Sequence, residues 1–212
     1  MKRALVQAIS HIAVFALVAA FASGCAAQKK ANPGTPMPIT NAEIKHICDD
    51  KTPKECNNTG VKFENDKDYE RAKLCYQKAC DDNEGIACSN LGSLHQKLKS
   101  KDESEILTIF AKSCTLGNKY GCYNAANFYR LGRGTEHDFA AARRLYEKSC
   151  LKLNHAQSCS NLGGMYQFSL GVKTADSKTA KKFYKMGCEM GDEIGCRNLS
   201  LIGDELNLIT LS

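Results

Sequence analysis

The sequence has 212 residues, a formal net charge of +6, 43% hydrophobic residues and 12 cysteines. Its length and apolar content suffice for a hydrophobic core. Positive and negative residues are mixed along the chain rather than gathered into a basic block, which argues against nucleic acid as a partner. So many cysteines indicate an oxidising compartment, because cytosolic proteins keep few disulfides.

A targeting segment is predicted at the start of the chain. Two basic residues precede an almost wholly apolar run that ends near Ala22, as in a secretory signal. This end resembles a bacterial lipoprotein signal, with Ser23, Gly24 and Cys25 at the lipobox positions. The resemblance implies cleavage before Cys25 and lipidation of its sulfur. We therefore expect residues 1–24 to be a lipoprotein signal peptide.

The alternative is an uncleaved transmembrane anchor, since the apolar run is near the length that spans a bilayer. The polar residues Gln7, Ser10 and His11 within the run favour the cleaved signal. Lipidation would attach the protein to a membrane through its acyl chains, and residues 25–39 are expected to form a tether. The predicted location is exported: a lipoprotein of the periplasm or outer membrane, or a secreted protein.

Five cysteine pairs divide the remaining residues, 40–212, into repeats. The pairs are Cys48 with Cys56, Cys80 with Cys88, Cys114 with Cys122, Cys150 with Cys159, and Cys188 with Cys196. The first members of successive pairs are 32, 34, 36 and 38 residues apart, a period typical of helix-turn-helix solenoids. We expect an all-α fold, an α/α solenoid of five repeats with a C-terminal cap.

The first helix of each repeat is predicted to end near the first cysteine of the pair. Four residues before that cysteine stand Ile44, Tyr76, Phe110, Tyr146 and Tyr184. Twelve residues before it, in the last four repeats, stand Asp68, Asp102, Asp138 and Asp176. These carboxylates are suited to cap a helix N-terminus, and Glu105 would complete a capping box with Asp102. Left-handed residues that end the helix are expected at Asn83, Gly117 and Gly191.

The second helix is predicted to begin near the second cysteine. Four residues beyond that cysteine stand Gly60, Gly92, Ala126, Gly163 and Ser200. Small side chains at this spacing let another helix pack closely against the backbone. The first repeat is the most polar, as expected of a terminal unit that meets water.

A column of asparagines is the strongest candidate for ligand binding. Two residues beyond the second cysteine stand Asn58, Asn90, Asn124, Asn161 and Asn198. Because an amide both donates and accepts, such a ladder is suited to bind an extended peptide backbone. The alternative is that each asparagine bonds a neighbouring repeat and is structural. Tyr129 and Tyr166, seven residues beyond the second cysteine, are expected either to contact the ligand or to belong to the core.

The paired cysteines are predicted to form one disulfide in each repeat. Each pair joins the end of one helix to the start of the next across a short turn, where two Cα atoms come within disulfide range. Zinc binding is the alternative, but the spacing of eight or nine residues is unusual for zinc and the histidines share no column. Cys75 stands in an otherwise apolar column and is expected to be a buried free thiol. We predict no metal site and no cofactor.

Three segments resemble known repeats: ACSNLG at Ala87–Gly92, CYNAANFYRLGRG at Cys122–Gly134 and CSNLGGMY at Cys159–Tyr166. They are similar to Sel1-like repeats, and with a disulfide in every repeat they resemble the Helicobacter cysteine-rich protein family. The resemblance implies a right-handed α/α superhelix at the cell envelope or outside the cell. It also implies penicillin binding with weak β-lactamase activity.

No catalytic motif for that activity is found in the sequence, so the catalytic residues stay unknown. Ser149 and Lys152 fit the SxxK pattern of serine β-lactamases formally. However, Ser149 lies in a column of small residues beside a cysteine, which indicates packing. Two functions remain open. The first is a scaffold that binds a protein or peptide segment, including one related to peptidoglycan, and the alternative is a β-lactamase that binds β-lactams.

Overall fold

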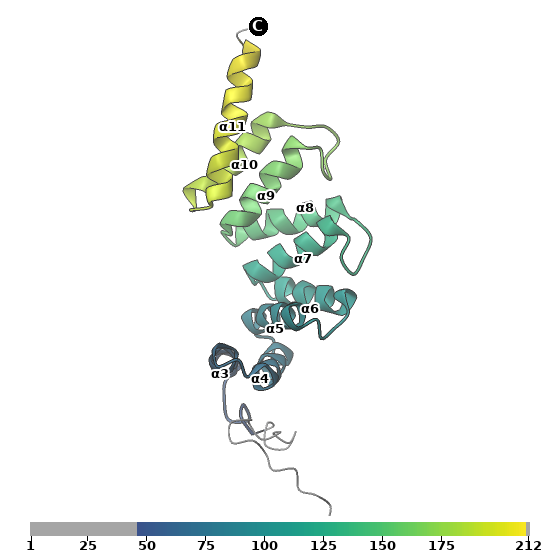
Figure 1. Ribbon diagram of the computed structural model, residues 1–212, viewed down its shortest axis with the longest axis vertical. Helices are drawn as coiled ribbons and strands as arrows, with labels where there is room; N and C mark the ends of the chain where they lie inside the picture. Colours follow the sequence, from purple (N-terminus) through teal and green to yellow (C-terminus); the bar gives the residue numbers. More distant parts are fainter. Residues whose placement is uncertain (1–45, 211–212) are drawn as a thin grey trace, which may run out of the picture. The chain divides into compact units, whose positions relative to one another are not determined.

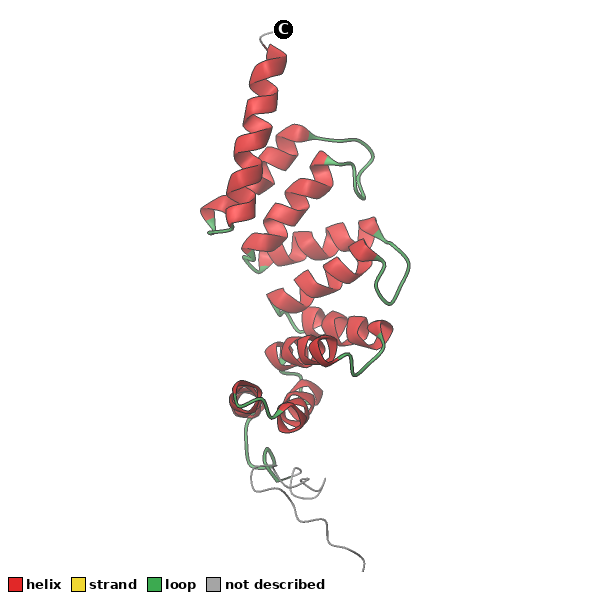
Figure 2. Ribbon diagram, in the orientation of Figure 1, coloured by secondary structure: helices red, strands yellow, loops and turns green. Residues whose placement is uncertain are grey.

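The computed structural model describes residues 46–210, with side chains up to Ile202. The predicted signal peptide, the lipidation site Cys25 and the tether lie outside these residues. The described chain is helical and contains no strand (Figures 1 and 2). Its helices are α3 (Pro53–Asn65), α4 (Tyr69–Asp81), α5 (Gly85–Leu98), α6 (Glu103–Thr115), α7 (Lys119–Leu131), α8 (Phe139–Glu147), the π-helical turn η1 (Lys148–Lys152), α9 (Ala156–Gln167), α10 (Ser177–Glu189) and α11 (Glu193–Thr210).

The helices form a solenoid in which every helix packs against the one before it and the one after it. Helices α4 and α5, α6 and α7, α8 and α9, and α10 and α11 are the successive pairs, and α3 is the second helix of the first repeat (Figure 1). The second helices also pack on one another, α3 on α5, α5 on α7, and α9 on α11. The predicted all-α solenoid is confirmed.

Aromatic side chains of the first helices pack directly on the glycines of the preceding second helices. The rings of Tyr76, Phe110, Tyr146 and Tyr184 are at most 1% exposed. A Cβ atom added at Gly92 would lie 2.7 Å from the ring of Phe110, and one added at Gly163 would lie 2.7 Å from the ring of Tyr184. The aromatic residues four positions before the first cysteine of a pair therefore pack against the small residues four positions beyond the second cysteine of the preceding pair. Burial of these rings supplies much of the hydrophobic stabilisation.

The predicted N-terminal caps are present at three of the four aspartates. Asp68, Asp138 and Asp176 each accept a hydrogen bond from a backbone amide of the first turn. The capping box predicted at Asp102 is wrong. The Asp102 side chain makes no capping bond, and the Glu105 carboxylate, which would complete the box, instead accepts a hydrogen bond of 2.8 Å from Lys101 Nζ.

A capping box does form at the start of α3, where none was predicted. Thr52 Oγ1 accepts from the amide of Glu55, and the Glu55 carboxylate accepts from the amide of Thr52 at 2.9 Å. Pro53 follows as the first helical residue, where its missing N–H costs nothing. Residues 46–52 form turns and bends, so the predicted first helix of the first repeat does not extend to Cys48. The backbone turns there, with Lys51 N donating to Cys48 O.

Each repeat contains one disulfide between the predicted cysteines. The bonds are Cys48–Cys56, Cys80–Cys88, Cys114–Cys122, Cys150–Cys159 and Cys188–Cys196, with Cα atoms 4.3 to 5.4 Å apart. The fourth pair has one extra residue. The π-helical turn η1 contains Cys150 at the end of α8, and its wider turn accommodates that insertion.

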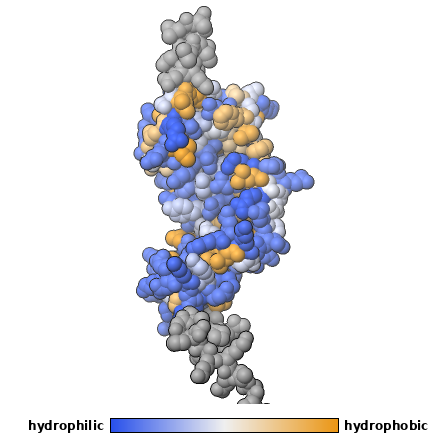
Figure 3. Space-filling model, in the orientation of Figure 1, coloured by the Kyte–Doolittle hydropathy of each residue, from blue (hydrophilic) through white to orange (hydrophobic). Residues whose placement is uncertain are grey.

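The face of the described chain seen in Figure 3 is mostly hydrophilic, with apolar residues in separate small patches. Among the described residues, no helix combines the length and apolar character that a membrane span requires.

The left-handed residues expected at the turns within repeats are present, with φ of 65° at Asn83, 83° at Gly117 and 90° at Gly191. The turns are therefore built as the sequence indicates.

Candidate functional site

A cleft of about 440 Å³ opens where the fourth repeat meets its neighbours. One wall comes from the first turns of α7, which carry Lys119, Tyr120, Tyr123 and Asn124. The other walls come from residues 154–157 at the start of α9 and from residues 190–191 after α10. Its rim is partly apolar, since the Tyr120 side chain is 50% exposed.

The cleft coincides with the one irregular cysteine spacing. The turn η1 packs against both α7 and α9, whereas the second helices of the neighbouring repeats pack on one another directly. A longer connection between Cys150 and Cys159 therefore lies beside the opening. The extra residue noted in the sequence marks the place where the solenoid departs from regularity.

His155 forms the floor of the cleft and is held rigidly. Its ring centroid lies 4.8 Å from that of Tyr123 and 5.2 Å from that of Tyr120. Its Nδ1 atom lies 2.9 Å from Ser158 Oγ, which itself donates to Ser149 Oγ at 2.8 Å. Because the Ser158 proton is used in that second bond, Nδ1 must be the donor to Ser158.

Burial, together with the nearby charge of Lys119, lowers the pKa of His155 to about 4. The ring is therefore neutral at neutral pH. Its side chain is only 5% exposed, so it serves as an aromatic surface rather than as a general base in contact with solvent.

Ser149 lies in the core, as its column predicts. It is 0% exposed, and its hydroxyl donates to the carbonyl oxygen of Lys119 at 2.9 Å. A nucleophile must reach its substrate, so this arrangement gives the SxxK pattern no catalytic meaning. Lys152, the other member of the pattern, is exposed.

Three asparagines of the column lie beside other polar groups of the protein. Asn90 Nδ2 donates to Asn57 Oδ1 of the preceding repeat at 3.0 Å. Burial raises the pKa of the Tyr146 hydroxyl, and hydrogen bonds from Arg130 and Asn161 oppose that rise. Burial likewise raises the pKa of Tyr184, opposed by a hydrogen bond from Asn198. Asn90 therefore has a structural partner in Asn57, and Asn161 and Asn198 lie close enough to the hydroxyls of Tyr146 and Tyr184 to affect their pKa values.

Asn124 differs because its own repeat has Phe110 where the fourth and fifth repeats have Tyr146 and Tyr184. A phenyl ring offers no hydroxyl, and no hydrogen bond joins the Asn124 side chain to another described residue. Asn124 is half-buried and lines the cleft. Within the predicted ladder, Asn124 is therefore a half-buried amide in the cleft wall whose groups are free to bond a ligand.

The two tyrosines considered as ligand contacts pack inside the solenoid. Tyr129 lies half-buried against the cores on both of its sides. Tyr166 stacks on Phe183 with ring centroids 5.5 Å apart, and its hydroxyl donates to Glu147 at 3.4 Å. Neither lines the cleft.

Tyr120, Tyr123 and Lys119 were missed by the sequence reasoning. All three lie within three residues of Cys122 in the sequence. They do not recur in the other repeats, and this was the one sign in the sequence that they could have a role of their own. Among the described residues, no carboxylate lies within ion-pair distance of Lys119, whose Nζ sits 5.4 Å from the centroid of Tyr120. The cleft lining contains no acidic residue, and Lys119 is its one lysine or arginine.

A protein-family model called Sel1 repeat matches residues 65–84, 119–152 and 156–192. The chain is a Sel1 repeat protein. Two known proteins are similar in sequence to part of this Sel1 repeat protein. Cytochrome c oxidase assembly factor 7 of Xenopus tropicalis is 33% identical over 103 residues, 44% of this chain and 45% of that protein. Human Protein sel-1 homolog 2 is 28% identical over 91 residues, 43% of this chain and 13% of that protein. The Sel1 repeat protein thus spans less than half the length of these relatives.

Solved structures with the same fold include two bacterial proteins. A Sel1 repeat protein from Oxalobacter formigenes superimposes with a TM-score of 0.65 at 22% identity, over 71% of this chain and 62% of that one. Cysteine rich protein B of Helicobacter pylori superimposes with a TM-score of 0.51 at 31% identity, over 63% of this chain and 96% of that one. The Sel1 solenoid is therefore shown by structure as well as by sequence.

Proposed function

We propose that this Sel1 repeat protein is a scaffold that binds an extended segment of a partner protein in the cleft beside Asn124. The observation that carries the proposal is the unpartnered amide of Asn124 in the wall of a 440 Å³ cleft, whereas Asn90 bonds Asn57 and Asn161 and Asn198 lie beside tyrosine hydroxyls. An amide that both donates and accepts matches the alternating groups of a peptide backbone.

The other residues of the cleft indicate the chemistry of the segment. Tyr120, Tyr123 and His155 offer aromatic surface for an apolar or aromatic side chain. Lys119 has no acidic neighbour in the lining and favours a carboxylate on the ligand. The expected ligand is an extended peptide with an acidic residue beside an apolar one.

The experiment selects binding peptides from a displayed library on the oxidised protein and measures their affinity by fluorescence anisotropy. Asn124→Ala is expected to weaken binding about tenfold, the value of one hydrogen bond of about 1 to 1.5 kcal/mol. Its melting temperature should stay unchanged, because no other described residue loses a partner. Asn90→Ala is the matched control, and it should lower the melting temperature because Asn57 loses its bond.

A second variant tests the reason for the free amide. Phe110→Tyr supplies the hydroxyl that the fourth and fifth repeats have, and it is expected to engage Asn124 and reduce peptide binding. Selected peptides that bind wild type, Asn124→Ala and Phe110→Tyr equally would refute the site.

The exported address is part of the same proposal. Five disulfides indicate an oxidising environment, which agrees with the lipoprotein-like sequence that ends at Cys25. Metabolic labelling with a fatty acid is expected to mark the wild-type protein and not Cys25→Ser. Equal labelling of the two would reject lipidation at this cysteine. We do not propose β-lactam hydrolysis, because the serine of the SxxK pattern, Ser149, is buried in the core.

A further inference from the structure

Three sulfur atoms gather in the first two repeats, away from the cleft. The Sγ atoms of Cys48, Cys56 and Cys75 all lie within 4.8 Å of one another, and all three residues are buried. Cys48 and Cys56 form a disulfide, whereas Cys75 is the one described cysteine outside a disulfide. The same column holds Ile109, Leu145 and Phe183 in the later repeats, so packing alone does not require a thiol there.

Cys56 and Cys75 face each other from two helices in close contact. Cys56 Sγ lies 3.2 Å from the carbonyl oxygen of Cys75. One turn further along α3, a Cβ atom added at Gly60 would lie 3.2 Å from Cys75 Cβ. The two backbones therefore run close at this level. The two sulfur atoms lie within 4.8 Å of each other, against a bonding distance of about 2 Å in a disulfide.

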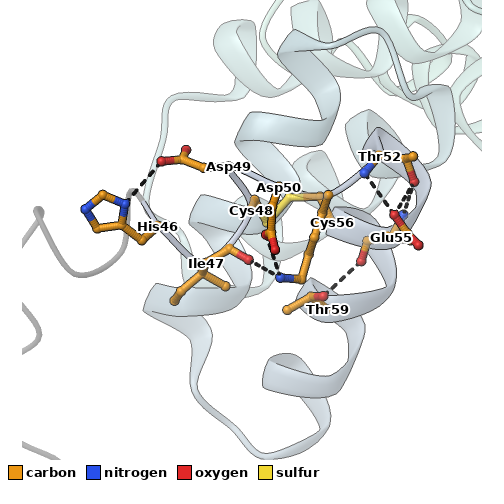
Figure 4. Close-up of polar contacts among 10 residues, drawn as sticks. His46, Ile47, Cys48, Asp49, Asp50, Thr52, Glu55, Cys56 and Thr59 are labelled. Atoms are coloured by element: carbon orange, nitrogen blue, oxygen red, sulfur yellow. Dashed lines mark hydrogen bonds and ion pairs between the residues drawn. A yellow bond between two sulfur atoms is a disulfide. The ribbon is translucent and has the colours of Figure 1, made fainter.

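Cys48, by contrast, is carried by a segment outside the helices. Residues 46–52 form turns and bends before α3 (Figure 4). The segment is held by few bonds of its own, chiefly Lys51 Nζ to the carbonyl oxygen of Ile47 at 2.6 Å. The side chains of His46 and Asp50 are 79% and 85% exposed. Once its disulfide opens, Cys48 is held in the core by the packing of its neighbour Ile47 and by these few bonds.

We propose that Cys75 exchanges with the Cys48–Cys56 disulfide and releases Cys48 as a reactive thiol. The thiolate of Cys75 attacks Cys56 Sγ, the Cys56–Cys75 bond forms and the Cys48–Cys56 bond breaks. Cys48 leaves with the electron pair and takes up a proton in place of the one that Cys75 lost. One disulfide and one thiol are present before and after, so the step needs no oxidant or reductant.

The exchange has a consequence for binding. Helix α3 stays covalently tied, now to α4, while the segment that carries Cys48 is freed. The Cys48 thiolate can then attack a disulfide of a partner protein, forming a mixed disulfide and releasing the partner's other sulfur as a thiol. The expected partner is thus a protein with an accessible disulfide, and this inference stands apart from the peptide cleft.

The Cys48–Cys56 form is the resting state. Burial raises the pKa of Cys75 to about 11, with the charges of Lys51 and Arg71 opposing the rise. The thiolate that attacks is therefore scarce at neutral pH, and the exchange is slow. This explains how a free thiol persists beside a disulfide without rapid scrambling.

The first test traps the released thiol. The full chain with Cys25→Ser is oxidised, incubated with iodoacetamide at about pH 8.5, where thiolates are more abundant, and mapped by mass spectrometry without reduction. We expect alkylated Cys48 to accumulate together with a Cys56–Cys75 cross-link. In the same chain with Cys75→Ser, alkylation of Cys48 should be at least about tenfold lower. Alkylation of Cys75 alone, or none on Cys48 above that control, would overturn the proposal.

The second test asks whether Cys56 and Cys75 can form a disulfide, independently of how fast the exchange occurs. Cys48→Ser in the same Cys25→Ser chain leaves Cys56 and Cys75 as the facing pair. After oxidation, titration of thiols in denaturant should find none, and mapping should find the Cys56–Cys75 bond. Two free thiols would show that the pair cannot bond and would refute the exchange. Because the titration is made in denaturant, it counts buried thiols as well as exposed ones, and the mapping shows whether the bond joins Cys56 to Cys75.

Discussion

The contact between α9 and α10 allows a sharp test of the packing at Gly163. A Cβ atom there would lie 2.7 and 2.8 Å from two ring atoms of Tyr184, closer than real Cβ atoms approach. The ring cannot move freely, because Tyr184 is 1% exposed and its hydroxyl donates to Gln167 at 2.7 Å. Gly163→Ala should therefore force the helices apart, at a cost of about 1 to 3 kcal/mol.

The neighbouring Gly164→Ala is a matched control. A Cβ atom at Gly164 meets only the Tyr184 hydroxyl at 3.4 Å, an ordinary contact. Both substitutions gain the same helix propensity of up to about 1 kcal/mol, so their difference isolates the overlap. At about 3 °C per kcal/mol for a domain of this size, Gly163→Ala should melt roughly 3 to 9 °C below Gly164→Ala, measured by far-UV circular dichroism with the disulfides intact. Equal melting temperatures would refute the close approach.

Two further predictions concern the disulfides and the buried histidine. Replacing both Cys114 and Cys122 with alanine should lower the free energy of unfolding by about 2 to 3 kcal/mol in denaturant titrations, the entropy of a loop of this length; an unchanged midpoint would contradict a stabilising role. His155 has a folded-state pKa of about 4, below its ordinary value of 6.5, so the unfolded chain binds more protons between these pH values. Stability should be complete above about pH 6.5 and fall by up to roughly 3 kcal/mol toward pH 4. His155→Phe should flatten this slope in melts across that range, leaving the part due to His95, whose pKa burial also lowers; a slope as steep as that of wild type would exclude His155 as its source.

Much of the fold follows from the sequence because the repeats align their residues in columns. The aromatic at Tyr184 and the glycine at Gly163 are each ordinary residues, but their recurrence at fixed offsets predicts a contact. The cysteine pairs fixed the helix ends for the same reason. The columns do not show which of two nearby groups a side chain will bond. Glu105 pairs with Lys101 instead of capping with Asp102, and a single sequence does not show which partner is preferred.

The cleft was harder to predict, since it arises where the repeats differ. The insertion between Cys150 and Cys159 is plain in the sequence, but its accommodation in a π-helical turn against α7 and α9 depends on packing in three dimensions. Lys119, Tyr120 and Tyr123 fall outside the repeat columns, so a search for recurring residues passes over them.

The asparagine column shows why a repeated residue need not have a repeated role. In the fourth and fifth repeats the amide meets a tyrosine hydroxyl, and the residue belongs to the scaffold. In the third repeat a phenylalanine, Phe110, removes that hydroxyl and leaves Asn124 free for a ligand. The informative position is therefore not the asparagine itself but the aromatic residue fourteen positions before it. A binding site in a solenoid of this kind is found by asking, column by column, which polar side chain has lost its internal partner.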